Sequence, residues 1–199
     1  MSDHEVAAGP LSSWMLEIRA AIRDESDSDV PCAGCTACCR SAHFVHIAPD
    51  ETDTLARIPA ELLFPAPGWP RGHLVLGYDE RGHCPMLIDD QCSIYEHRPT
   101  TCRTFDCRIY TVAGIDADDD KVEITRRAQQ WRFDIGPGDD ATQSAVRAAA
   151  AYLDTHAGVL GCTPVNQTQL AILALEIHEV FLHDDDPDPA VVRAALAEC

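Results

Sequence analysis

Eight cysteines in two blocks constrain this 199-residue chain more than any other feature. In chain order they are Cys32, Cys35, Cys38, Cys39, Cys84, Cys92, Cys102 and Cys107. The first block follows the pattern C-x2-C-x2-C-C, and a two-residue gap lets one turn of chain present two sulfur atoms to the same ion. The blocks therefore predict a metal site in which all eight cysteines are candidate ligands. The metal is either zinc or an iron–sulfur cluster, with a four-iron cluster as one form.

The way these thiols share metal is left open by their spacing. Cys38 and Cys39 are adjacent, so they cannot easily point at the same ion. Eight thiols could fill two four-sulfur sites, or one site with a reactive pair left over. The two remaining cysteines, Cys162 and Cys199, lie outside the pattern. We expect Cys162 to be a buried small apolar residue and Cys199 to play no part in metal binding.

The N-terminal sequence favours a cytoplasmic location. Residues 1–5 are polar and acidic, without the basic and apolar regions of a secretion signal. No apolar run approaches the roughly 18 residues that span a bilayer. Cytosolic thiols are kept reduced, so closely spaced cysteines in such a protein are metal ligands or redox groups more often than disulfides.

The chain has a net charge of −18, from 33 acidic and 15 basic residues, and this charge limits the kinds of molecule that it can bind. Nucleic acid and anionic membranes attract basic surfaces, so we expect neither as a partner. Residues 32–108 carry only −3 of this charge, which makes the cysteine-rich segment the least acidic part of the chain. A protein partner stays open and unidentified.

Hydrophobic periodicity predicts a mainly α-helical fold with a small β-hairpin. The expected helices are 11–24, 49–55, 139–157, 166–183 and 187–197, with a short helix after Pro99. A strand is expected at 43–47, and segments 73–78 and 84–88 are expected to pair as the hairpin. Residues 1–31 then form an N-terminal helix and linker, 32–110 a cysteine-rich, metal-clamped lobe, and 111–199 a helical region packed with that lobe as one globular unit.

The cysteine blocks and their companions resemble the YkgJ-type cysteine-cluster family, which is described as a zinc- or iron-chelating CxxCxxCC domain. The resemblance covers residues 32–107 and includes CAGCTACC and CPMLIDDQCSIYEHRPTTCRTFDC. Members commonly carry proline before the last cysteine, where this chain has Asp106. That difference affects the local turn more than the ligand.

The resemblance also implies a possible enzyme. A related cysteine cluster occurs in flagellin lysine N-methylases, so modification of a protein or small molecule is conceivable. Gly136-Pro137-Gly138 lacks the strand and helix that flank an S-adenosylmethionine loop. The pair His178-Glu179 followed by His183 is not a zinc-protease motif either, because HExxH needs histidines four residues apart.

Charged companions of the cysteines are candidates for supporting roles. Four arginines, which could offset thiolate charge, are Arg40, Arg98, Arg103 and Arg108. Five histidines in the same segment are weaker ligand candidates, since eight thiols are available: His43, His46, His73, His83 and His97. Among the histidines His83 is favoured, because it adjoins Cys84.

We therefore expect a metal-binding protein more than a stand-alone enzyme, because no general base or nucleophile accompanies the thiols. An iron–sulfur enzyme is the alternative. A thiol redox switch using C-x2-C pairs is the second alternative, although the chain lacks a thioredoxin-like βαβ pattern.

Overall fold

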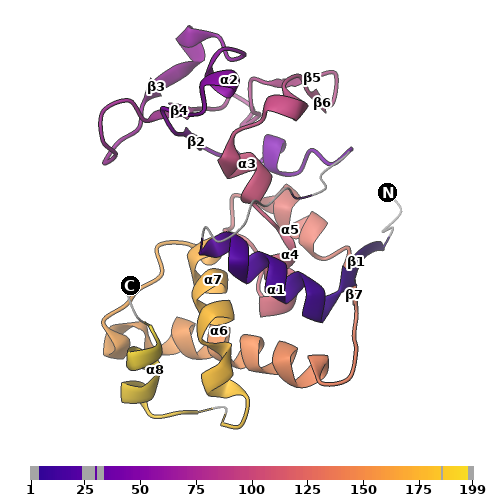
Figure 1. Ribbon diagram of the computed structural model, residues 1–199, viewed down its shortest axis with the longest axis vertical. Helices are drawn as coiled ribbons and strands as arrows, with labels where there is room; N and C mark the ends of the chain where they lie inside the picture. Colours follow the sequence, from indigo (N-terminus) through magenta and orange to yellow (C-terminus); the bar gives the residue numbers. More distant parts are fainter. Residues whose placement is uncertain (1–4, 24–29, 31–33, 185, 197–199) are drawn as a thin grey trace. The chain divides into compact units, whose positions relative to one another are not determined.

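The computed structural model describes residues 5–23, 30, 34–184 and 186–196. The chain divides into two compact units (Figure 1). Unit 1 comprises Met1–Asp27, Cys107–Asp119 and Thr125–Cys199. Unit 2 comprises Ser28–Asp106 and Asp120–Ile124. Unit 1 is thus assembled from segments that are distant in sequence, while unit 2 contains most of the cysteine-rich segment.

Unit 1 is mainly helical. Its helices and strands are β1 (Val6–Pro10), α1 (Leu11–Ile22), α4 (Arg108–Ala113), β7 (Trp131–Asp134), α6 (Asp139–Leu160), α7 (Gln167–Ile177), the 3₁₀ turn η4 (His178–Phe181) and α8 (Pro189–Ala195). The helix α5 (Val122–Ala128) begins in unit 2 and ends in unit 1. The strands β1 and β7 pair in parallel, with Val6 opposite Trp131. This pairing attaches the N-terminal segment to the middle of the chain.

The core of unit 1 lies around α6 and α7, which pack against each other and against α4. The buried stripe of α6 includes Val146, Ala149 and Leu153, spaced three or four residues apart, together with Ala145. Alanines in such a stripe let a neighbouring helix approach closely, so packing density is reached with few aromatic residues. Gly161 ends α6 with a φ of +74°, a conformation that a residue with a side chain seldom adopts.

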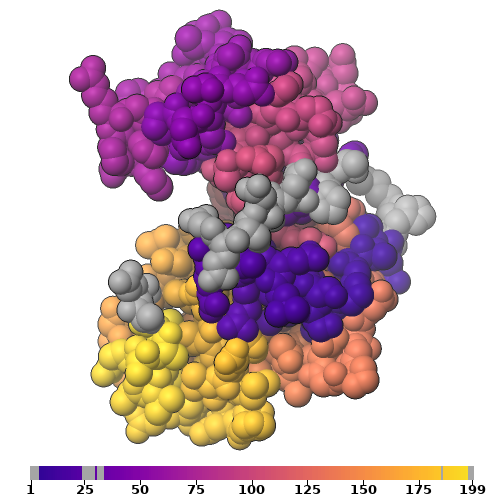
Figure 2. Space-filling model, viewed as in Figure 1, coloured from indigo at the N-terminus to yellow at the C-terminus, as the bar shows by residue number. Residues whose placement is uncertain are grey.

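The N-terminal part of unit 1 contacts its C-terminal helices. Trp14, on the buried side of α1, lies 5.2 Å from Phe133 of β7, measured between ring centroids. In Figure 2 the indigo surface of β1 and α1 lies against the orange and yellow surface of the C-terminal helices. The first and last thirds of the chain therefore share one core.

Unit 2 is built from short elements. They are η1 (Cys38–Arg40), β2 (Val45–Ile47), α2 (Thr52–Leu55), η2 (Ala60–Leu62), β3 (Leu63–Pro65), β4 (Leu74–Leu76), β5 (Leu87–Ile88), β6 (Gln91–Cys92), η3 (Tyr95–His97) and α3 (Thr100–Thr104). The antiparallel sheet has the order β2-β4-β3, and Leu76 pairs with Val45 on one side and Leu63 on the other. A small core packs against three cysteines and is formed by Val45, Ile47, Ile58, Leu76, Met86 and Ile94.

The fold class is confirmed: the structure is mainly α with small β elements. Helices and turns occur at 11–24, 49–55 and after Pro99 as expected, in the form of α1, α2 and α3. The predicted helix 166–183 is α7 followed by the tighter turn η4. Within the described residues, no helix has the length and apolar character that a bilayer crossing requires.

The predicted pairing of 73–78 with 84–88 is wrong. The strand β4 pairs instead with β2 and β3, and β5 pairs with β6 through a two-residue turn. The reason is that β4 is the central strand of its sheet, so both of its edges are already paired and neither is left for residues 84–88. Periodicity also did not predict the parallel pair β1–β7, because these two strands are more than 100 residues apart.

Candidate metal centre

Six cysteines line one cavity of about 530 Å³ within unit 2. They are Cys35, Cys38, Cys39, Cys84, Cys92 and Cys102. All six are free thiols, and each is partly buried. The two cysteine blocks are 45 positions apart between Cys39 and Cys84, and they therefore converge on one space from distant parts of the sequence.

Two backbone hydrogen bonds bring the first block to the start of the second. Cys84 donates to the Cys39 carbonyl at 2.7 Å, and Ala42 donates to the Gly82 carbonyl at 2.8 Å. The bond at Gly82 depends on a tight turn in which this residue has a φ of +77°. A Cβ there would lie 3.2 Å from Ala42 Cβ, so glycine also permits the close approach.

The β5–β6 hairpin places Cys84 near Cys92. Asp89 and Asp90 form its two-residue turn with φ values of +48° and +60°, the sign that a type I′ turn requires. Leu87 pairs with Cys92, and its backbone N–H donates to the Cys84 carbonyl at 2.9 Å. Sequence reasoning missed this hairpin, although aspartate is among the residues that tolerate positive φ.

Cys102 is delivered by the short helix α3. Pro99 caps this helix, and its carbonyl accepts the Cys102 N–H at 2.9 Å. Thr101 Oγ1 donates to the His46 carbonyl at 2.8 Å, which attaches α3 to the sheet. Helix and sheet thus bring a third segment of chain to the cavity.

The thiols influence one another electrostatically. Burial raises the pKa of the Cys102 thiol, and Cys84, Cys39 and Cys92 raise it further, while the Arg98 guanidinium opposes the rise. Burial also raises the pKa of Cys84, with a contribution from Cys92. Cys102 therefore lies within interaction range of three other thiols from both blocks.

The donor set fits zinc or iron chemistry. Thiolate sulfur is a preferred ligand of Zn²⁺ and of iron–sulfur clusters. Among the described residues, no three histidine, cysteine or acidic side chains are already close enough to hold a metal ion. Binding requires that the thiols lose their protons and that their sulfur atoms move toward the metal.

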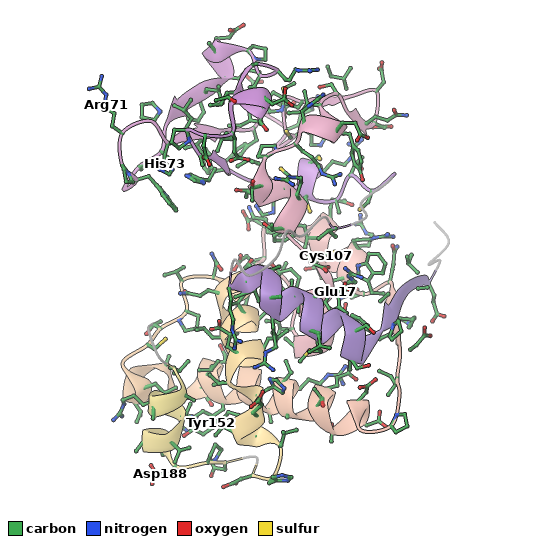
Figure 3. All side chains as sticks on the ribbon, in the orientation of Figure 1. Glu17, Arg71, His73, Cys107, Tyr152 and Asp188 are labelled. Carbon is green, nitrogen blue, oxygen red and sulfur yellow. The ribbon has the colours of Figure 1, made fainter. Side chains whose placement is uncertain are left out.

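Cys32 and Cys107 are the two predicted ligands that are not among these six. Cys32 lies outside the described residues. Cys107, labelled in Figure 3, is assigned to unit 1. The Trp131 indole N–H donates to its sulfur at 3.3 Å. Nothing in the sequence pointed to this tryptophan, because it follows Cys107 by 24 residues. Both cysteines stay predicted ligands.

The predicted histidines differ in their surroundings. His43 lies in the cavity wall, whereas His83, which adjoins Cys84, is not among the lining residues. His46 Nε2 and His73 Nδ1 are 2.9 Å apart, and Trp69 stacks on His46 with a centroid distance of 4.2 Å. His97 is hydrogen-bonded to Asp53.

The residues predicted to have other roles are also placed. Cys162 is buried, as expected, with 4% of its surface exposed, but it is disulfide-bonded and so is no free thiol. Cys199 lies outside the described residues. His178 is buried in η4 with its Nδ1 2.7 Å from the Leu175 carbonyl. This position is consistent with packing in unit 1.

Comparison with known proteins agrees with the cysteine pattern. A family model, CxxCxxCC, described as "Putative zinc- or iron-chelating domain", matches residues 31–130. The match continues past the last cysteine of the motif through α4 and α5. No curated protein and no solved structure matches the chain. The matched residues amount to half of the sequence and support metal binding in general, and the chain therefore belongs to the CxxCxxCC family.

Proposed function

We propose that unit 2 binds a thiolate-ligated metal centre and that Cys39, Cys84, Cys92 and Cys102 are its inner ligands. The observation that carries this proposal is the convergence of six thiols on one cavity. Three of them, Cys39, Cys84 and Cys92, act electrostatically on the thiol of Cys102. Four sulfur ligands complete the coordination of a zinc ion or a cluster. Cys35 and Cys38 line the same cavity, and Cys32 and Cys107 are the remaining candidates.

We further propose that the centre is an iron–sulfur cluster rather than one zinc ion. Four sulfur atoms around zinc, each at about 2.3 Å, enclose the ion completely and need no wider space. A cavity of about 530 Å³ bordered by six thiols favours a larger centre that contains several metal and sulfide ions. When bound, such a cluster supplies one-electron chemistry.

The chain's own residues have two tasks toward this centre. The cysteine thiolates hold it, and the buried apolar part of the wall limits the access of water to it. That part includes Val45, Met86 and Ile94. A dry surrounding strengthens electrostatic interactions with the bound charge and influences the reduction potential of a cluster.

The test is metal analysis of full-length protein purified without oxygen. We expect iron and acid-labile sulfide in fixed ratio, with a brown colour that is lost on reaction with a strong iron chelator. Stoichiometric zinc in colourless protein would contradict the cluster and retain the thiolate site. Protein that contains neither metal, and takes up neither after reduction, would contradict both statements.

A further inference from the structure

A centre held by four thiolates needs positive charge nearby. A zinc ion and a four-iron cluster core can each carry a charge of +2. Four thiolate ligands around such a core leave a net charge near −2. Burial makes such a charge costly, and a fixed cation beside the sulfur atoms offsets part of that cost. Four arginines adjoin the cysteines in sequence, so sequence alone does not show which of them has this task.

Of the four arginines, three are not among the residues that line the cavity: Arg40, Arg103 and Arg108. Arg103 directly follows Cys102, yet its Nη2 donates to Thr100 Oγ1 at 3.2 Å. Arg40 forms an ion pair with Asp90. In unit 1, Arg108 donates to the Ala8 carbonyl at 3.1 Å. Proximity in sequence to a cysteine therefore does not identify the arginine whose charge lies near the thiols.

Arg98 differs from them in burial and position. Only 8% of its surface is exposed, and it lies in the wall of the cavity with the six thiols. Its guanidinium carbon is 3.8 Å from the centroid of the Tyr95 ring, which orients the planar group.

We propose that Arg98 is the fixed counter-charge of the thiolate centre. The inference rests on the proposed function, because the charge has this role only when the thiols have lost their protons to a metal. Arg98 is then a positioning residue and donates no ligand atom. Its removal is expected to weaken the metal-bound form selectively, whereas loss of a merely structural arginine would weaken both forms.

The experiment uses full-length protein, reduced and freed of metal, titrated with cobalt(II) in competition with a chelator. Thiolate-to-cobalt charge-transfer absorption reports coordination. We expect Arg98→Met to bind cobalt about 10- to 100-fold more weakly, the usual range for residues that support metal ligands. Arg98→Lys keeps the charge and is expected to recover most of this loss. Arg103→Met is the matched control and is expected to bind as the unmodified protein does.

Unfolding of the metal-free protein separates charge from structure. A counter-charge matters most when the opposite charge is present, so its loss should affect the metal-bound form more than the metal-free form. Arg98→Met should therefore lower the stability of the metal-bound protein toward urea by more than it lowers the stability of the metal-free protein. If Arg98→Met does not fold, the comparison of Arg98→Lys with Arg98→Gln replaces it, with weaker cobalt binding expected for the glutamine variant.

Several outcomes would overturn the inference. The first is that Arg98→Met binds cobalt as tightly as the unmodified protein does. The second is that this variant destabilises the metal-free and metal-bound forms equally. The third is that Arg98→Lys binds cobalt as weakly as Arg98→Met does. In each of these cases the unmodified protein still binds cobalt, and the proposed function stands. If the unmodified protein binds neither cobalt, zinc nor iron, the proposed function fails and the inference fails with it.

Discussion

Asp79 determines how the chain enters the cysteine cavity. Its Oδ1 accepts the backbone N–H groups of Arg81 and His83, each at 2.9 Å. The His83 N–H is the main cause of a lowered pKa for the Asp79 carboxyl. This carboxylate closes the turn that precedes Cys84, so an acidic side chain outside the ligand set positions one of the proposed ligands.

At the residue scale, Cys102 is expected to be the most sensitive ligand, because its thiol interacts with those of Cys39, Cys84 and Cys92. Cys102→Ser should remove most of the bound metal and lower the stability of the loaded protein. Metal content by elemental analysis and the urea midpoint check this. Cys35→Ser should also lower metal content, to a smaller degree, because Cys35 lines the cavity without that electrostatic link.

The control for this substitution is Cys199→Ser, which lies outside the motif. We expect the metal content of that variant to equal that of the unmodified protein. Full metal retention by Cys102→Ser would contradict the proposed inner ligand set, and full retention by Cys35→Ser would contradict the role assigned to the first block.

His178 predicts a pH dependence in unit 1. Burial lowers its pKa below the ordinary value of 6.5, and the Arg19 charge lowers it as well, although the Leu175 carbonyl and Glu179 oppose the shift. The folded state therefore binds fewer protons than the unfolded state in this range. Stability is fully present above about pH 6.5 and is lost as the pH falls below it.

Urea unfolding followed by helical circular dichroism at pH 7.5 and at about pH 5.5 checks this expectation. His178→Gln should be less stable at neutral pH and should lose part of the pH dependence. An unchanged pH dependence in this variant would assign the effect to other groups.

At the element scale, the start of α7 depends on Asn166. Its side-chain oxygen accepts the Gln169 N–H at 2.9 Å and so satisfies one of the free donors of the first turn. Asn166→Ala is expected to lower the free energy of unfolding by about 1 kcal/mol. Asn166→Asp keeps the acceptor and should remain close to the unmodified protein in urea denaturation. A loss of stability that is equal in the two variants would contradict the capping role.

The small hairpins show where periodicity was insufficient. Segments 73–78 and 84–88 both have strand composition and a turn between them, which predicted that they pair. Their partners were decided by hydrogen bonds to β2, β3 and Cys39, which are distant in sequence. By contrast, the long amphipathic helices α6 and α7 were predicted because their pattern is local.

At the scale of the whole molecule, the two units should respond differently to metal removal. In unit 2 the strands have two or three residues each, so bound metal is expected to contribute much of its stability. Unit 1 has a helical core formed by α6 and α7. Treatment of the reduced, loaded protein with a chelator should increase hydrogen exchange in unit 2 and leave exchange in these two helices largely unchanged.

Hydrogen exchange with mass spectrometry measures both units in the same sample. Chelation of the Cys102→Ser variant is the control and should change exchange little, because that variant holds little metal. An equal loss of protection in both units would contradict the assignment of the metal centre to unit 2.

The sequence alone determined the chemical class of this protein, the type of fold and the candidate ligands. Those conclusions depend on residue types and short spacings, which chain geometry converts directly into helices and sulfur pairs. Only the tertiary structure decided that six of the thiols line one cavity, that Arg98 rather than Arg103 accompanies them, and that Cys107 belongs to unit 1 beside Trp131. These arrangements result from contacts between segments many residues apart, and local periodicity contains no information on which distant segments meet.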